Sequence, residues 1–250
     1  INNNDMTIEE FSNSFDTLLN SYALTSNFGE ETSKQTITLD EYEKSVFLTK
    51  AQEEIVLSLY NGKNPYGDTF EGTEELRRYL SNLITEKYLK PITNTSGTPL
   101  GLESKSKFFT LPEDLWFITL ESVVVDNSKC GAETIMNIMK VYPVKQDEYQ
   151  VIRDNPFRGA NDRRALRLDL SEGNVEIICK YMIAVYYIRY IKKVPPIILE
   201  DLPNDLTIEG KNEASDCILH EALHQKILER AVQIALQSKG YSLDKGNRDN

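Results

Sequence analysis

Apolar side chains recur at helical spacing in the first third of the chain. Thr7 and Glu10 have the spacing of a capping box, which predicts a helix that begins there. Its expected apolar face is Phe11, Phe15, Leu18, Leu19 and Tyr22. Thr73 is in turn expected to cap a later helix. The residues on one side of that helix are Leu76, Leu80, Leu83 and Ile84.

Between these two helices the pattern predicts two further helical pieces. Asp40 can cap the first of them, which we expect to end near Leu48. Thr49 and Gln52 have capping-box spacing again, so a new helix is expected to begin there. Gly62 then predicts its end, because glycine readily adopts the left-handed conformation that closes helices.

From about residue 87 the pattern changes to β-branched and aromatic residues, which are typical of strands. The segments 87–92 and 107–111 flank a turn-rich stretch and predict a hairpin. One or two helical turns are expected at 146–154. The remaining expected strands are 115–126, 133–144, 165–170, 174–179 and 182–191.

The last part of the chain combines a proline-marked connection, 194–203, with a short strand-like piece at 206–209 that closes on Gly210. An amphipathic helix is expected over 218–238, with core positions at Leu219, Leu223, Ile227, Ala231 and Ile234. The pattern predicts an α+β fold with N-terminal helices, a central, largely antiparallel sheet and a long C-terminal amphipathic helix. We expect a single domain over 1–250, helical over 1–86, β-rich over 87–210, with the C-terminal helix and tail over 211–250.

The charge balance argues against broad nucleic-acid affinity. The chain carries a formal charge of −11, whereas nucleic-acid binding depends on cationic surfaces that release counterions. The same charge suits a surface past which DNA slides, although solubility alone also explains it. The three cysteines, Cys130, Cys179 and Cys217, form no disulfide or metal-binding pattern, which favours a reducing compartment. The longest apolar run, 182–188, is too short to cross a bilayer, so no membrane partner is expected.

One string matches a metalloprotease motif. His220, Glu221 and His224 have H-E-x-x-H spacing, so on a helix both imidazoles could bind Zn²⁺ while the glutamate acts as a base. However, the chain holds no third histidine, and Glu229 lies too close on the same predicted helix to complete a tetrahedral site. We therefore expect no cofactor and no catalytic site, and keep a zinc-dependent metallohydrolase as the alternative function.

Arginines gather in a short segment of this acidic chain. They suit phosphate or carboxylate partners, because the guanidinium group donates in a fork. DNA-backbone contact, contact with an acidic patch on another subunit, and pairing with nearby acids are all open, and the net charge favours the last two over DNA. The candidate partner-contact residues are Arg153, Arg158, Arg163, Arg164 and Arg167.

Several strings together resemble one family of phage proteins. They are Leu48-Thr-Lys-Ala-Gln-Glu-Glu-Ile-Val56, Asp154-Asn-Pro-Phe-Arg-Gly159, Ala165-Leu-Arg-Leu-Asp-Leu170, Pro195-Pro-Ile-Ile-Leu-Glu-Asp-Leu202, Ile208-Glu-Gly210 and the stretch from Cys217 to Ala235. In this order they resemble the ring proteins, also called head–tail connector or neck proteins, of crAss-like tailed bacteriophages. The likeness spans residues 45–237.

The resemblance implies a structural subunit of the virion neck or tail that is not an enzyme and is assembled in the host cytoplasm. It further implies a homo-oligomeric ring, expected to hold twelve copies, between a portal protein and neighbouring ring or tail proteins. Genome DNA would pass through the lumen without sequence-specific binding. No catalytic or ligand residues follow from the family, and an assembly scaffold that is absent from the finished particle stays open as a third function.

Overall fold

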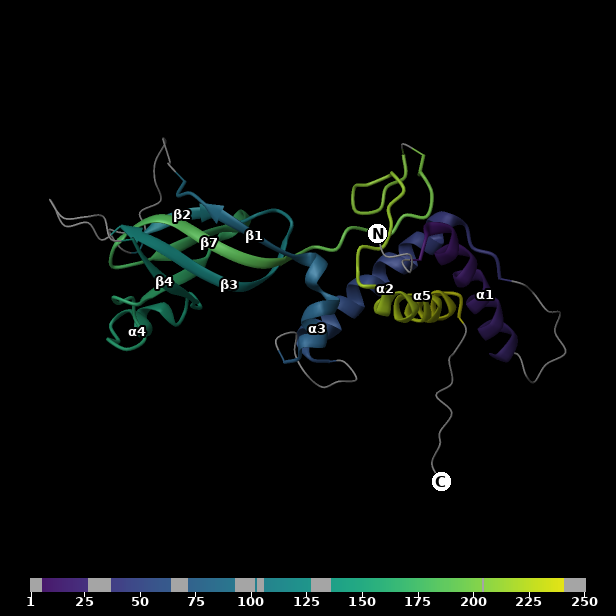
Figure 1. Cartoon of the computed structure of the whole chain (residues 1–250), viewed down its shortest axis with the longest axis horizontal. Helices are drawn as coiled ribbons and strands as arrows, with labels where there is room; N and C mark the ends of the chain where they lie inside the picture. The colour runs from purple at the N-terminus through teal and green to yellow at the C-terminus, as the bar shows by residue number, and fades with distance from the viewer. Residues whose placement is uncertain are drawn as a thin grey trace, which may run out of the picture. The chain divides into compact units, whose positions relative to one another are not determined.

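A computed structural model of the chain describes residues 6–26, 37–63, 72–92, 102, 106–126, 136–203 and 205–240 (Figure 1). The chain divides into two compact units. The first, which we call the helical unit, combines Ile1–Leu83 with Val194–Asn250, and the second, the sheet unit, is Ile84–Lys193. The predicted α+β class is confirmed, while cooperative folding as one domain stays a prediction.

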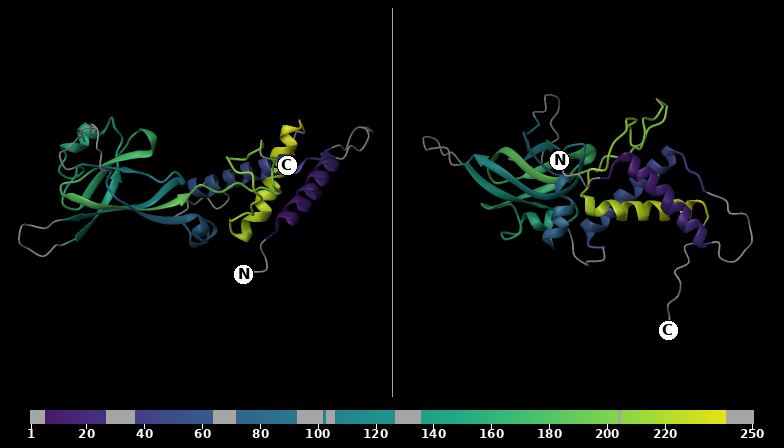
Figure 2. Two further views of the ribbon diagram at one scale, coloured as in Figure 1. Left: turned by 90° about the horizontal axis from the view of Figure 1, so that it is seen from above. Right: turned by 45° about the vertical axis from the view of Figure 1, so that its right-hand side comes forward.

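Three helices form the core of the helical unit. They are α1 (Ile8–Ser26), α2 (Glu41–Asn61) and α5 (His224–Ser238), and α5 packs against both others (Figure 2). The capping box at the start of α1 is confirmed, because Thr7 N donates to Glu10 Oε2 (2.9 Å) and Glu10 N donates to Thr7 Oγ1 (3.3 Å). Phe11, Phe15 and Leu19 of its predicted apolar face are fully buried.

Helix α2 is continuous, so the predicted break at Leu48 and the second capping box are wrong. Asp40 does cap the helix, and Gly62 ends it with φ 73°. Thr49 lies inside the helix, where its hydroxyl donates to Ile197 O (3.3 Å) and accepts from Ile197 N (3.2 Å). The hydroxyl therefore pairs with a strand-like segment 148 residues away in sequence rather than with its own helix end.

The third predicted helix is shorter than its apolar spacing suggests. Thr73 caps α3 (Glu74–Tyr79) by accepting from Leu76 N (3.2 Å). A 3-10 turn, Ser81–Leu83, follows, and Ile84 already opens the first strand. Leu76, Leu80 and Leu83 are nevertheless buried as predicted.

The described part of the sheet unit is built on seven strands in the order β1-β7-β3-β4-β5-β6-β2. All neighbours are antiparallel except β4 and β5, which run parallel and are joined by the short helix α4 (Tyr149–Arg153). The strands are β1 (Ile84–Leu89), β2 (Lys107–Thr110), β3 (Leu115–Asp126), β4 (Met136–Pro143), β5 (Arg164–Asp169), β6 (Asn174–Ile178) and β7 (Met182–Lys192).

The predicted hairpin between the first two strands is wrong. β1 pairs with β7, and β2 pairs with β6, so the two strands occupy opposite ends of the strand order. A backbone hydrogen bond from Ile92 N to Phe108 O (2.8 Å) brings the chain after β1 back to β2. The sheet is therefore curled, and long-range pairing outweighs the local turn.

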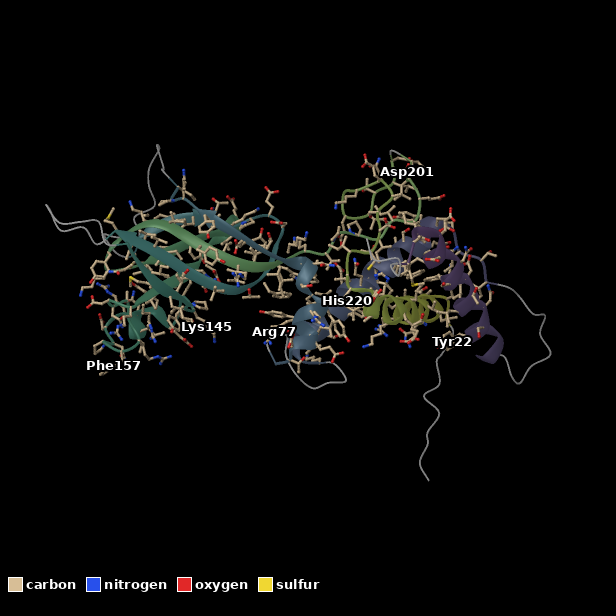
Figure 3. All side chains as sticks on the ribbon, viewed as in Figure 1. Tyr22, Arg77, Lys145, Phe157, Asp201 and His220 are labelled. Atoms are coloured by element: carbon tan, nitrogen blue, oxygen red, sulfur yellow. The ribbon has the colours of Figure 1, made fainter. Side chains whose placement is uncertain are left out.

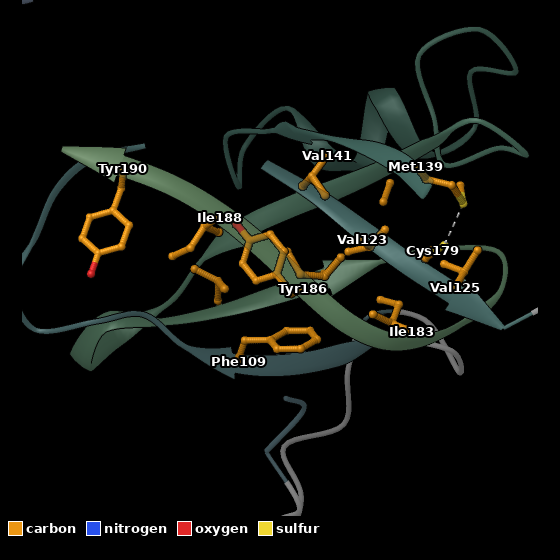
Figure 4. Packing of buried hydrophobic residues seen from close by; sticks show 13 residues of the cluster. Phe109, Val123, Val125, Met139, Val141, Cys179, Ile183, Tyr186, Ile188 and Tyr190 are labelled. Atoms are coloured by element: carbon orange, nitrogen blue, oxygen red, sulfur yellow. Dashed lines mark hydrogen bonds between the residues drawn. The ribbon is translucent and has the colours of Figure 1, made fainter. Parts of the chain in front are cut away.

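The interior of the sheet unit is filled from several strands (Figure 4). Tyr186 and Tyr190 of β7 are completely buried and belong to this core. Cys179 Sγ lies 3.7 Å from Met139 Sδ. The cluster comprises Phe109, Val123, Val125, Met139, Val141, Ala165, Val175, Ile177, Cys179, Ile183, Tyr186, Ile188 and Tyr190.

The chain after β7 returns to the helical unit. Ile198 exchanges backbone hydrogen bonds with Ser215, whereas the predicted strand at 206–209 is reduced to a single bridge between Ile208 and Lys211. Glu209 and Gly210, both with positive φ, form the turn inside that bridge. Among the described helices, none is long and apolar enough to span a membrane.

Candidate functional site

The structure separates the five candidate arginines into two groups. Arg153 ends α4, and Arg158 and Arg163 lie on the loop that follows it, so these three are exposed. Arg164 and Arg167 belong to β5 and are only partly accessible. The two β5 arginines have partners inside their own chain, and Arg153 Nε lies 3.9 Å from Oδ1 of the exposed Asp154.

Arg167 belongs to a buried ionic network in the sheet unit. Its side chain is 11% exposed and that of Glu121, on β3, is 9% exposed. Arg167 Nη1 donates to Glu121 Oε2 (2.8 Å), and Tyr186 Oη donates to the same oxygen (2.6 Å). The exposed carboxylate of Asp169 lies 2.9 Å from Arg167 Nε. Arg167 thus pairs with one nearby acid, Asp169, but its main partner is a buried glutamate from another strand.

Burial shapes the protonation of this network. Burial disfavours the charged form of Arg167, yet the carboxylates of Glu121 and Asp169, with the Tyr186 hydroxyl, keep the pKa of the guanidinium above its ordinary value. Burial, and then the adjacent Glu121 carboxylate, strongly raise the pKa of the Tyr186 phenol. Arg167 therefore stays charged and Tyr186 stays neutral, which suits a structural pair rather than a partner contact.

Arg164 supports the loop that carries the exposed arginines. Its Nη1 donates to the carbonyl oxygens of Phe157 (3.0 Å) and Arg158 (3.3 Å). Its guanidinium carbon lies 4.3 Å from the ring centroid of Tyr142, a cation–π contact. The side chain thus fixes the loop from β5 and satisfies two of its carbonyls.

Two more residues of the Asn-Pro-Phe-Arg-Gly string fix the loop locally. The side-chain oxygen of Asn155 accepts from the backbone N–H groups of Phe157 (2.9 Å) and Arg158 (3.1 Å). Gly159 N donates to Asn155 O (2.7 Å). A Cβ at Gly159 would lie 2.8 Å from the carbonyl oxygens of both Arg153 and Asn155, so only glycine fits.

This rigid loop presents a large apolar side chain that the sequence pattern did not single out. Phe157 is 84% exposed at the surface of the sheet unit (Figure 3), and Val151 on α4 is 77% exposed. Exposed aromatic residues on ordered loops are typical of interaction sites. The available sequence signal was the Asn-Pro-Phe-Arg-Gly string itself, in which turn-forming residues enclose an aromatic one.

A second ion pair lies beside this loop. Lys180 Nζ (2.7 Å) and Tyr181 Oη (2.8 Å) both donate to Asp162 Oδ1. These hydrogen bonds lower the pKa of the Asp162 carboxyl and, in return, raise the pKa of Lys180. Asp162, an acid close in sequence to the arginines, therefore pairs with Lys180.

A pocket of about 540 Å³ opens elsewhere on the sheet unit. Its wall is mostly apolar, and Ile92, Phe108 and Leu170 supply large hydrophobic side chains. It lies where β5 ends, since Asp169 is the last residue of that strand. The full lining is Ile92, Phe108, Gln146, Asp169, Leu170, Ser171 and Asn174.

The predicted helix start at residue 218 is wrong, because α5 begins at His224, so His220 and His224 do not share the α-helical face that a zinc site would need. His220 precedes the 3-10 turn Glu221–Leu223 with ψ 138°, and its Nδ1 accepts from Ala222 N (3.2 Å). His224 is buried at the start of α5, with Nε2 3.0 Å from Leu219 O and its ring 5.3 Å from that of Phe11. Across the described residues, no three His, Cys, Asp or Glu side chains gather in a way that could hold a metal ion.

Comparison with known proteins gives consistent matches along nearly the whole chain. Residues 6–247 match the model of a family described as phage tail ring protein 3/4. "Ring protein 3" of Bacteroides phage crAss001 is 47% identical over 235 residues, which cover 94% of this chain and 96% of that protein. "Ring protein 4/5" of the same phage is 31% identical over 239 residues, covering 92% of each chain.

Proposed function

Because the chain belongs to the phage tail ring protein 3/4 family, we propose that it is a subunit of a twelve-membered ring in the neck of a crAss-like phage. The ring lies between the portal protein and the tail, contacts a neighbouring ring or tail protein on each side, and surrounds the passing genome. Its work is structural, and no bond is made or broken. The observation that carries the proposal is the 47% identity to "Ring protein 3" over 94% of the chain.

The charge of the chain supports the channel role. A chain with a formal charge of −11 binds DNA phosphates weakly, so the genome can slide through a lumen formed by such chains. The Arg167–Glu121 ion pair also supports the channel role, because it holds one of the candidate arginines in the protein interior, where it does not contact DNA.

For the candidate contact residues we propose a division of roles. Arg153, Arg158 and Arg163 contact a protein partner, whereas Arg164 holds their loop and Arg167 stabilises the sheet. Reversing the exposed charges, in R158E/R163E, is expected to weaken assembly and leave the melting temperature of the monomer unchanged. Unimpaired assembly of this variant would remove these arginines from the interface.

Quantitative mass spectrometry of purified virions tests the proposed role. We expect one copy of this chain for each copy of the portal protein in the finished particle. Absence from mature virions but presence in assembling ones would instead identify a scaffold. One bound zinc ion per purified chain, together with hydrolytic activity lost in His220→Ala, would support the metallohydrolase alternative.

A further inference from the structure

A ring of identical subunits has one geometric requirement that the sheet unit can meet by itself. Each copy must present two different, complementary surfaces, because rotation about a ring axis joins the head of one copy to the tail of the next. This inference rests on the proposed ring function and concerns how the ring closes.

We propose that Phe157 of one copy inserts into the pocket at Ile92, Phe108 and Leu170 of the next copy. Phe157 is the most exposed of the large hydrophobic side chains in the described part of the chain, at 84%. The pocket is mostly apolar and, at about 540 Å³, has room for a phenyl ring. An aromatic anchor in an apolar pocket is the arrangement that dominates the binding energy of many protein interfaces.

The anchor and the pocket are positioned at the two ends of β5. Arg164, the first residue of the strand, holds the Phe157 carbonyl, whereas Asp169, its last residue, lines the pocket. Five residue steps at about 3.3 Å each separate these residues by roughly 17 Å along the strand. One rigid element therefore fixes the relative position of both surfaces, which a repeating head-to-tail contact requires.

The charges around the two features are complementary. Around the anchor, five basic side chains face two acidic ones, a formal surplus of three positive charges: Arg153, Arg158, Arg163, Arg164 and Lys180 against Asp154 and Asp162. Within two residues of the pocket lining, five acidic side chains stand against four basic ones, a surplus of one negative charge: Asp147, Glu148, Asp169, Glu172 and Glu176 against Lys90, Lys107, Lys145 and Arg167. Net charges of opposite sign favour this orientation of the two surfaces.

The anchor is also ready for binding before a partner arrives. Asn155, Gly159 and Arg164 fix the backbone around Phe157 through hydrogen bonds and close packing. Binding therefore costs little ordering of the loop, which favours a stable contact.

Two complementary variants test the contact with the full-length chain. Phe157→Asp removes the anchor and leaves the pocket, whereas Leu170→Asp places a charge in the pocket and leaves the anchor. In sedimentation velocity we expect wild-type rings, and monomers of each variant, with the dissociation constant of the contact raised about 30-fold or more. An equimolar mixture of the two variants should give heterodimers and nothing larger. In each heterodimer the intact anchor of Leu170→Asp fills the intact pocket of Phe157→Asp, and the two remaining surfaces are both disrupted.

Ile138→Asp is the matched control, since Ile138 is also apolar and 76% exposed on the sheet unit but lies on β4, outside both features. Its rings should persist, and circular dichroism should show all three variants folded. Rings of Phe157→Asp, or a mixture that stays monomeric, would overturn the contact while leaving the ring function intact. Loss of rings in Leu170→Asp alone would mean that the pocket takes a different occupant. A wild-type chain that stays monomeric at millimolar concentration would count against the ring function itself.

Discussion

Replacing Arg167 by methionine isolates the energy of the buried pair in the sheet unit. The substitution keeps much of the side-chain volume but leaves the Glu121 carboxylate, 9% exposed, with the Tyr186 hydroxyl as its hydrogen-bond partner among the described residues. Removing one member of a buried ion pair costs about 3–5 kcal/mol. For a chain of this size each kcal/mol lowers the melting temperature by about 2–4 °C, so we expect a fall of roughly 6–20 °C.

The chain carries a convenient probe for this experiment. Its single tryptophan, Trp116, lies on β3 of the sheet unit, so its fluorescence during urea unfolding reports on the unit that holds the pair. Asp169→Asn is the control, because the Asp169 side chain is 67% exposed and its pairing with Arg167 should contribute no more than about 1 kcal/mol.

The double variant Glu121→Leu/Arg167→Met separates the pair from the packing around it. Without a buried charge it should recover much of the lost stability, since apolar replacements of buried pairs are often neutral. A loss below about 1 kcal/mol in Arg167→Met would refute the assignment of this arginine to the interior and return it to the candidate contact surface.

Three further outcomes follow from the structure. Gly159→Ala should destabilise the sheet unit by about 1–3 kcal/mol in urea unfolding, because its Cβ would overlap two carbonyl oxygens; an unchanged midpoint would contradict the close approach. Burial raises the pKa of Tyr186 in the folded chain, so above pH 10 this tyrosine ionises in the unfolded chain but stays neutral in the folded one. The contribution of Tyr186 to the free energy of unfolding is therefore complete below pH 10 and is lost as the pH rises. Wild type should therefore lose about 1.4 kcal/mol per pH unit more than Tyr186→Phe above pH 10, and parallel curves would refute this. If the two units fold as the single domain that the sequence predicts, unfolding followed by Trp116 fluorescence and by helical circular dichroism should coincide, and two midpoints would contradict it.

Sequence patterns predicted the features of this fold that depend on near neighbours. The caps at Thr7, Asp40 and Thr73 form as expected because each side chain reaches a backbone N–H three residues away. The strands from β3 to β7 were also found, since their runs of β-branched and aromatic residues are long. Both the capping spacing and the strand-forming runs lie within the segment that adopts the predicted structure.

Three of the wrong predictions involve partners that are distant in sequence. Thr49 has the spacing of a cap, but it pairs with Ile197, which no local pattern reveals. β1 and β2 flank a stretch rich in turn-forming residues, yet β1 pairs with β7 and β2 pairs with β6. Pattern reasoning placed Arg167 on the surface because its partner Glu121 lies 46 residues earlier on another strand. The exposure of a side chain is likewise not readable from local sequence, so the structure was needed to show that Phe157 lies at the surface.

Cryo-electron microscopy of intact virions, with the neck reconstructed at its own symmetry, tests the central claim most directly. We expect density for this chain in a closed ring around the DNA channel, with every copy contacting the next in the same head-to-tail manner. Copies that are absent from the neck, or present singly and away from the channel axis, would contradict a ring subunit between portal and tail.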